Sequence, residues 1–255
     1  MAAPLNLLCL PYAGGNASVY REWSARMPGW VNVIPLHMPG RGVRQRMAPV
    51  HEWKALLDLL VDDVRTDLGR PFAIFGHSMG ALIGVELAYE LRDRYRVSPV
   101  WFGASACIAP SRREREDKWL DCPADELFEE IKSLNGTADE LLGNPELMAL
   151  VTPMLRADFH LCGTHHYRKR LPLQCPMLVL GGTRDEDVVK DRDNLLAWSE
   201  ETSGPVSVEM LEADHFFINT HRSWVIDKVS SSLERDSLLR PISRSNPQEK
   251  KCAAM

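Results

Sequence analysis

Ser78 stands in the sequence GHSMG, with one glycine two positions before it and another two positions after it. An apolar run at residues 72–75 comes directly before this motif, and an apolar helical pattern up to Tyr89 follows it. The motif alone occurs by chance in roughly one chain in ten of this length, so its placement carries the argument. Between a strand and a helix, Gly-x-Ser-x-Gly is typical of a sharp turn that presents the serine hydroxyl at the edge of a sheet. We therefore interpret Ser78 as a candidate nucleophile, with the backbone amide of Met79 facing an oxyanion.

A serine hydroxyl becomes a strong nucleophile at neutral pH only when a base accepts its proton, and the base works best when a carboxylate fixes its tautomer. Among eight histidines, His215 is the one that lies in a turn directly after the last predicted strand, downstream of every acidic loop. His77 adjoins Ser78, so its side chain leaves the turn in a different direction. We therefore predict His215 as the base. The other histidines fall in or after predicted helices, in polar loops or at helix starts: His37, His51, His160, His165, His166 and His221.

The acid is expected on the loop after the strand that precedes the last one. Three carboxylates stand together there, on Asp185, Glu186 and Asp187. Asp185 follows a glycine pair at the strand end and lies three residues before Val188, which is the spacing expected of the acid. We therefore predict Asp185 as the acid, with Asp187 as the alternative. The other carboxylates of the cluster are expected to cap the next helix.

A glycine-rich loop, PYAGGNAS, follows the apolar run at residues 5–10. Gly14 and Gly15 permit backbone geometry that other residues resist, so amides near Ala13 can point into a site. By itself such a loop is equally consistent with an ordinary turn between a strand and a helix. Together with the serine turn, it stands where the second backbone donor for an oxyanion is expected.

The elements that must position these residues alternate along the chain. Continuous apolar runs predict buried strands, and apolar residues at a spacing of 3.6 predict helices. The strands are expected at residues 5–10, 31–36, 72–75, 100–107, 175–180 and 206–211. The helices are expected at residues 18–27, 51–68, after Ser78, and at 191–201 and 223–239. This alternation predicts an α/β fold with a mostly parallel central sheet flanked by helices.

The alternation stops between residues 111 and 171, where no strand pattern occurs. Two amphipathic helices are predicted there instead, at 123–134 and 145–161. An insertion between two sheet strands lies above their carboxyl ends, over Ser78, so we expect a helical lid that shapes substrate access. The expected organisation is a core of residues 1–110 and 172–240, a lid insertion of residues 111–171, and a disordered polar tail of residues 241–255.

Composition limits the classes of protein to consider. The 255 residues include 45% hydrophobic and 25% charged side chains with a net charge of −5, which is typical of a globular domain and argues against nucleic acid as a partner. The six cysteines are scattered without a C-x-x-C pair, as expected of free thiols in a reducing compartment. The histidines of the insertion lack a metal-binding spacing, and no apolar run reaches the roughly 18 residues of a membrane span. We expect a cytoplasmic protein without metal or membrane partners.

Several stretches together resemble the type II thioesterases of the α/β-hydrolase superfamily, which are stand-alone enzymes that serve nonribosomal peptide and polyketide synthases. The stretches run from the first strand to the last helix, and their combination is far more specific than the serine motif alone. They are LPYAGGNAS, PLHMPGRGVR, FAIFGHSMGALIG, LRADF (155–159), LGGTRDEDV with Trp198 after it, and DHFFI (214–218).

This resemblance implies hydrolysis of thioesters that link acyl or aminoacyl groups to the phosphopantetheine arm of carrier protein domains, which clears misprimed or stalled synthases in antibiotic or siderophore biosynthesis. Acyl-CoA and acyl-pantetheine are further candidate substrates, no metal or organic cofactor is implied, and a monomer is expected. The chain departs from the family at Thr183, where relatives often have an acid. The roles implied are Ser78 as nucleophile, His215 as base, Asp185 as acid, and the backbone amides of Ala13 and Met79 as the oxyanion hole.

Two rival functions use the same scaffold. A small-molecule carboxylesterase or lipase has the same Ser-His-Asp triad, but such enzymes commonly carry an HGGG-type oxyanion loop, which PYAGG is not. A noncatalytic binding subunit is expected to lack a member of the triad, whereas all three candidates are present here.

Three arginines, Arg41, Arg44 and Arg46, stand on a predicted loop after Pro39. Such a cluster is usually a solvated face. The alternative is a contact for a phosphate or an acidic carrier protein, and charge reversal at Arg41 and Arg44 tests that contact.

Overall fold

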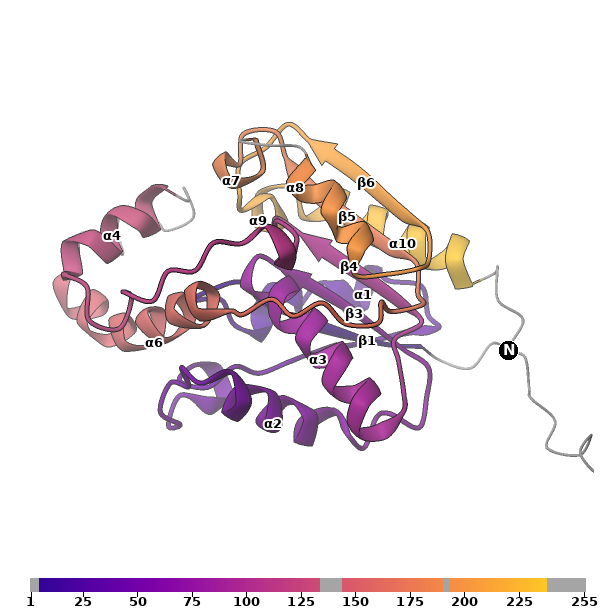
Figure 1. Ribbon diagram of the computed structural model, residues 1–255, viewed down its shortest axis with the longest axis horizontal. Coiled ribbons are helices and arrows are strands. Elements are labelled where there is room, and N and C mark those ends of the chain that lie inside the picture. Colours follow the sequence, from indigo (N-terminus) through magenta and orange to yellow (C-terminus); the bar gives the residue numbers. More distant parts are fainter. Residues whose placement is uncertain (1–4, 134–143, 190–192, 238–255) are drawn as a thin grey trace, which may run out of the picture.

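A six-stranded sheet forms the centre of the computed structural model, which describes residues 5–133, 144–189 and 193–237 (Figure 1). All neighbouring strands run parallel, in the order β2-β1-β3-β4-β5-β6. The strands are β1 (Leu5–Leu10), β2 (Val31–Pro35), β3 (Phe72–His77), β4 (Trp101–Ser105), β5 (Met177–Gly182) and β6 (Val206–Leu211). The mostly parallel sheet predicted from the alternation is confirmed.

Helices cover both faces of the sheet. Along β1, Leu8 and Leu10 pack into one apolar cluster with α2 and α3, whereas Leu7 and Cys9 pack into a second cluster with α1 and α10. This alternation is the period of two that a strand imposes on its side chains. The four strands inside the sheet are buried along their whole length, as expected of parallel strands covered on both faces. The covering helices are α1 (Trp23–Arg26), α2 (Trp53–Val64), α3 (Met79–Tyr95) and α10 (Arg222–Ser237).

The continuous helix expected at residues 18–27 is wrong. The structure has a short 3-10 helix, η1 (Ala17–Tyr20), and then the single helical turn α1. Tyr20 and Trp23 are both fully buried, and their rings meet edge to face with centroids 5.0 Å apart. The Tyr20 hydroxyl donates to the Leu10 carbonyl at 2.6 Å. Packing of these two rings against the sheet outweighs the helical periodicity of the sequence.

The helix expected at residues 191–201 is also divided. It consists of α8 (Asp193–Leu196) and a 3-10 helix, η4 (Ala197–Glu200), and residues 190–192 lie outside the described residues. The indole of Trp198 in η4 is fully buried and donates to the Cys107 carbonyl at 2.8 Å. This anchor to the end of β4 again favours a local turn over a regular helix.

The segment between β4 and β5 is helical, as expected, and no strand occurs in the part of it that the structure describes. It contains α4 (Ala124–Ser133) and α6 (Pro145–Thr164), and we call residues 111–171 the helical insertion. Figure 1 shows α4 and α6 to one side of the sheet, where the strand arrowheads point. Side chains of the insertion form an apolar cluster of their own: Trp119, Cys122, Leu127, Ile131, Met154, Leu155 and Phe159.

Most of the cysteines lie among the described residues. Among the described residues, Cys9, Cys107, Cys122 and Cys162 are free thiols as predicted. Cys252 and the tail expected at residues 241–255 lie outside the described residues. Within the described ranges, no helix is both long enough and apolar enough to cross a membrane.

Candidate active site

Ser78 occupies a strained turn between β3 and α3. Its backbone has φ 54° and ψ −121°, a conformation that side-chain-bearing residues rarely adopt. The two flanking glycines make this turn possible. A Cβ atom on Gly76 would lie 2.1 Å from the Gly80 carbonyl oxygen, and one on Gly80 would lie 2.1 Å from the Leu10 carbonyl oxygen. The amide of Ser78 donates to the Ser105 carbonyl at 2.7 Å, which ties the turn to β4.

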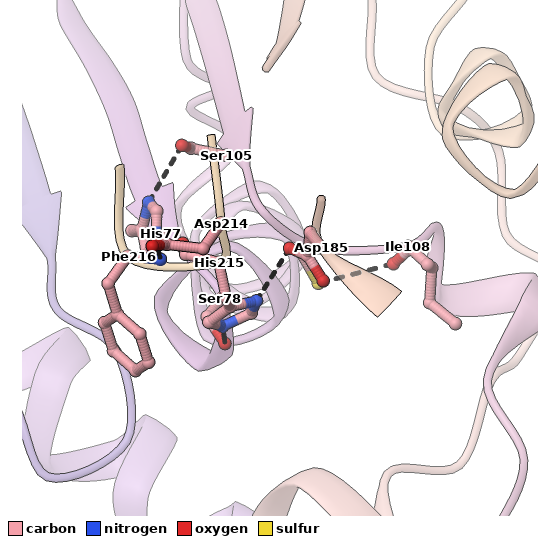
Figure 2. Close-up of polar contacts among 9 residues, drawn as sticks. His77, Ser78, Ser105, Ile108, Asp185, Asp214, His215 and Phe216 are labelled. Atoms are coloured by element: carbon pink, nitrogen blue, oxygen red, sulfur yellow. Dashed lines mark hydrogen bonds and ion pairs between the residues drawn. The ribbon is translucent and has the colours of Figure 1, made fainter. Parts of the chain in front are cut away.

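The three residues predicted to form a triad meet at one edge of the sheet (Figure 2). His215 Nε2 lies 2.9 Å from Ser78 Oγ, and His215 Nδ1 lies 2.7 Å from Asp185 Oδ2. Asp185 is 2% exposed and His215 is 6% exposed, whereas Ser78 is partly exposed. An ionised Asp185 accepts the Nδ1 hydrogen, so Nε2 of the neutral ring is free to accept the Ser78 hydroxyl proton.

Close contact between two loops sets the distance from acid to base. Asp185 follows β5 and precedes α7 (Glu186–Val189), and His215 follows β6 and precedes α9 (Phe217–Thr220). The loops touch because Gly182 has no side chain: a Cβ atom there would lie 2.4 Å from the Ala213 carbonyl oxygen. The amide of Arg184 donates to that same oxygen at 3.0 Å.

The geometry favours Asp185 over Asp187, the alternative acid. Asp185 is buried and bonded to the His215 ring, whereas Asp187 is exposed on the first turn of α7. Thr183, where family members often have an acid, is also exposed, and its amide donates to the Leu211 carbonyl at 2.8 Å.

A second histidine supports the first, and sequence reasoning did not find this role. His77 is fully buried, with Nε2 2.9 Å from the His215 carbonyl oxygen and Nδ1 2.9 Å from Ser105 Oγ (Figure 2). Burial lowers the pKa of His77 well below its usual value, and the nearby His215 ring lowers it further, so His77 is neutral. A carbonyl oxygen can only accept, so Nε2 donates to His215 and Nδ1 accepts the Ser105 hydroxyl hydrogen.

The two amides predicted to form an oxyanion hole belong to residues that line one cavity with Ser78. Met79 is the first residue of α3, where backbone N–H groups lack partners within the helix. Ala13 lies in the loop after β1, which turns back through a 2.9 Å bond from the Gly15 amide to the Tyr12 carbonyl. A backbone N–H at a helix start and another in a glycine loop suit a developing negative charge on oxygen.

The sequence and the fold have counterparts among known proteins. The thioesterase domain family matches residues 5–233 of the chain. The chain belongs to the thioesterase family. It is 36% identical over 232 residues to the gramicidin S biosynthesis protein GrsT of Aneurinibacillus migulanus, which covers 91% of this chain and 90% of that protein.

Solved structures agree with this assignment. The thioesterase is similar to ClbQ from the colibactin pathway, with 30% identity, a TM-score of 0.86, and coverage of 93% of this chain and 100% of that one. It is also similar to the type II thioesterase BorB from the borrelidin biosynthetic cluster, with 29% identity, a TM-score of 0.79, and coverage of 92% and 93%. The α/β-hydrolase fold and the serine thioesterase activity predicted from the sequence are thereby confirmed.

A cavity of about 120 Å³ opens beside the Ser78 hydroxyl of the thioesterase. Its walls come from both the core and the helical insertion, because Trp119, Phe159 and Cys162 line it together with Ser78 and His215. The insertion therefore contributes part of the cavity wall beside the serine, and its expected role as a lid stays a prediction.

Two thiols in this cavity are poor rivals to Ser78 as nucleophiles. Burial raises the pKa of Cys107 to about 11 and that of Cys162 to about 12. Since the thiolate is the reactive form, both side chains are almost entirely unreactive at neutral pH. Among the described residues, no group of three or more histidine, cysteine or carboxylate side chains could hold a metal ion.

Two of the three loop arginines of the thioesterase, Arg41 and Arg44, are paired inside the protein. Arg41 is 7% exposed and forms a two-bonded ion pair with Asp158 on α6. Arg44 is partly buried, binds the Asp63 carboxylate and donates to the His37 carbonyl at 2.7 Å. Both guanidinium groups therefore have internal partners. A contact of this loop with a phosphate or an acidic carrier, considered from the sequence, stays a prediction.

Proposed function

We propose that the protein removes misprimed or stalled acyl and aminoacyl groups from the phosphopantetheine arms of carrier protein domains in a nonribosomal peptide or polyketide synthase. The biosynthetic contexts of GrsT and BorB support this role. The observation that carries the proposal is the 2.9 Å contact between His215 Nε2 and Ser78 Oγ, with Asp185 2.7 Å from the other ring nitrogen. This contact makes Ser78 a nucleophile suited to an acyl carbon.

Acylation begins when Ser78 Oγ attacks the thioester carbonyl carbon and its proton passes to His215 Nε2. The carbonyl π electrons move onto the oxygen, where the amides of Met79 and Ala13 stabilise the negative charge. Asp185 stabilises the imidazolium and keeps its Nδ1 hydrogen in place. Collapse of the tetrahedral intermediate breaks the carbon–sulfur bond, and the pantetheine sulfur leaves with the proton from His215. The acyl group is then held as an ester on Ser78.

Deacylation repeats these steps with water as the nucleophile. His215 Nε2 takes a proton from water as the water oxygen attacks the ester carbon. The proton returns to Ser78 Oγ when the carbon–oxygen bond breaks, and the acyl group leaves as a carboxylic acid. The scheme uses only side chains, backbone amides and water, so it requires no metal or organic cofactor.

The cavity beside Ser78 supports short acyl groups as substrates. One water molecule needs about 10–15 Å³ of such space. A cavity of about 120 Å³ therefore has room for about 8 to 12 atoms of the size of a water oxygen, which is enough for a short acyl chain or an aminoacyl group. Acyl-pantetheine and acyl-CoA present the same thioester, so we propose them as further substrates, and the free thiols support a reducing compartment such as the cytoplasm.

A screen of loaded carrier domains tests this function. Carrier domains bearing acetyl, aminoacyl and long peptidyl groups are incubated with the full chain, and mass spectrometry follows the return of the free pantetheine thiol. We expect release of short acyl and aminoacyl groups by the wild-type protein and no release by Ser78→Ala. If every carrier stays loaded, the proposed function is wrong.

The same screen addresses the rival functions. Matched oxygen esters of the same acyl groups are expected to react more slowly than the thioesters, because a thiolate is the better leaving group. Hydrolysis of oxygen esters alone would favour a carboxylesterase or lipase. Carrier binding without turnover by the wild-type protein would favour a noncatalytic subunit.

A further inference from the structure

The carboxylate of Asp158 joins three segments that lie far apart in the sequence. It stands on α6 of the helical insertion and is only 4% exposed. Its Oδ2 atom accepts the backbone N–H of Gly14 at 2.8 Å. Both of its oxygens also bind the Arg41 guanidinium, at 3.0 Å from Nη2 to Oδ1 and by a second bond from Nη1 to Oδ2. Asp158 therefore ties α6 to residues 12–15, which we call the oxyanion loop.

The bond to Gly14 fixes the orientation of one peptide group in the oxyanion loop. The loop is a turn closed by the bond from Gly15 to Tyr12, with φ +76° at Gly14 and no positive φ at Ala13. Such a pattern is that of a type II turn, which differs from type I by a flip of its central peptide. Here that peptide joins Ala13 to Gly14. A flip would turn the Ala13 carbonyl oxygen toward the Asp158 carboxylate, and two acceptors repel each other.

Packing and charge hold Asp158 in place for this task. A Cβ atom on Gly14 would lie 2.8 Å from Leu155 Cδ2, so α6 rests directly against the oxyanion loop. A buried carboxylate is costly unless a cation pairs with it. Arg41 supplies that charge through two parallel bonds, which also set the angle of the carboxylate.

We propose that Asp158 and Arg41 are positioning residues for the oxyanion hole, an inference that rests on the proposed function of Ala13 as an oxyanion donor. The Asp158 carboxylate fixes the peptide after Ala13 and, together with Leu155 packed against Gly14, anchors the oxyanion loop to α6. The Ala13 N–H belongs to the preceding peptide of the same closed turn, so this anchor keeps that N–H in place at the cavity beside Ser78. Because Asp158 stands on α6, stabilisation of the tetrahedral intermediate depends on the position of this helix. The ion pair of Asp158 and Arg41 stabilises the transition state, where the charge on oxygen develops, and does not strengthen binding of the thioester.

Two variants and one control test this inference on the full chain. Asp158→Asn keeps the shape of the side chain, but its amide can donate to a flipped Ala13 carbonyl. The double variant Arg41→Met with Asp158→Leu removes both charges and fills the space, so it leaves no unpaired buried ion if Asp158→Asn fails to fold. Asp63→Asn is the control, since it removes the partner of Arg44, which is near Arg41 in the chain, without touching the oxyanion loop.

The readouts separate positioning from general damage. For each folded variant we measure kcat and KM on an acyl-pantetheine, inhibition by the matching trifluoromethyl ketone, and binding of the matching unreactive thioether. The ketone forms a tetrahedral adduct with Ser78, whereas the thioether resembles only the ground state. We expect kcat to fall about 10- to 100-fold, somewhat less than on complete loss of an oxyanion donor. We expect the affinity of the variants for the ketone to fall in proportion to kcat/KM. KM and the affinity for the thioether should change by less than about threefold.

Two results would overturn the inference. One is equal weakening of the ketone and the thioether, which indicates a structural role only. The other result is that kcat and the affinity for the ketone, in both variants, stay within about threefold of the values for the Asp63→Asn control. If the wild-type protein hydrolyses no thioester but binds the ketone, the proposed function fails, and the ratio of ketone to thioether affinity still decides the role of Asp158.

Discussion

His77 Nε2 lies 2.9 Å from the backbone carbonyl oxygen of His215, so the buried ring of one histidine supports the loop that carries the proposed base. Ser105 completes the support, since its hydroxyl donates to His77 Nδ1. This chain of bonds runs from β4 through the end of β3 to the loop after β6. It holds the base against the sheet, and burial keeps the His77 ring neutral.

Stability is expected to depend on pH through His77. Burial lowers the pKa of His77 well below 6.5, so below pH 6.5 the unfolded chain binds a proton that the folded chain resists. The stabilisation is complete above the unfolded pKa and is lost as pH falls toward the folded pKa. His77→Gln keeps an N–H donor for the His215 carbonyl but does not titrate. From pH 6 to pH 5, we expect the wild-type protein to lose more unfolding free energy than this variant, by an amount on the order of 1 kcal/mol for one proton.

Urea unfolding at pH 5, 6, 7 and 8 measures this difference. Above pH 7 the two proteins should show the same pH dependence, which serves as the internal control. Parallel curves over the whole range would mean that His77 does not resist protonation in the folded state.

The choice between the two candidate acids can be tested by exchange of single atoms. Asp185→Asn leaves the shape of the site but stabilises the wrong tautomer of His215, so we expect kcat to fall by about three to four orders of magnitude. Asp187→Asn changes an exposed carboxylate that lines the same cavity but is not the carboxylate bonded to the His215 ring, so kcat is expected to fall by less than about tenfold. Steady-state hydrolysis of an acyl-pantetheine measures both. A large loss in Asp187→Asn with little loss in Asp185→Asn would assign the role of the acid to Asp187.

The serine turn should tolerate no side chain at Gly76. A Cβ atom there would lie 2.1 Å from a backbone oxygen, which cannot move without breaking the turn. We expect Gly76→Ala to cost at least about 3 kcal/mol of unfolding free energy, or to prevent folding. Gly69→Ala is the matched control, because no atom lies within 4 Å of its added Cβ. Circular dichroism during chemical unfolding compares the two, and equal stability would contradict the geometry of the turn.

Acyl-chain preference should follow the size of the cavity. Trp119 is a large wall residue contributed by the helical insertion, so Trp119→Leu enlarges the space beside Ser78. We expect kcat/KM to favour short acyl-pantetheines in the wild-type protein and to shift toward longer chains by about tenfold in the variant, as a few added methylene contacts allow. Leu150→Ala, at a side chain that is 75% exposed on α6, should leave the profile unchanged. An unchanged profile in Trp119→Leu would show that the cavity does not select the chain.

Local pattern was enough to predict much of this protein. Apolar runs place the four strands inside the sheet, because a strand buried on both faces needs apolar side chains in nearly every position. The helix at residues 18–27 could not be predicted in its true form, since the rings of Tyr20 and Trp23 pack against residues that are remote in the chain. Likewise Arg41 looks like a surface arginine in the sequence, but it is buried, because its guanidinium pairs with the Asp158 carboxylate. That partner is 117 positions away along the chain, so no local pattern reveals it.

By itself the sequence determined the sheet, the turn at Ser78 and the places of Asp185 and His215, because glycine spacing and apolar periodicity act over a few neighbouring residues. The tertiary structure alone decided which carboxylate meets the His215 ring, that His77 supports His215, and that Asp158 holds Gly14. Those contacts join residues from 30 to 144 positions apart. Their distances depend on how whole loops and helices pack, and no local pattern of residues encodes them.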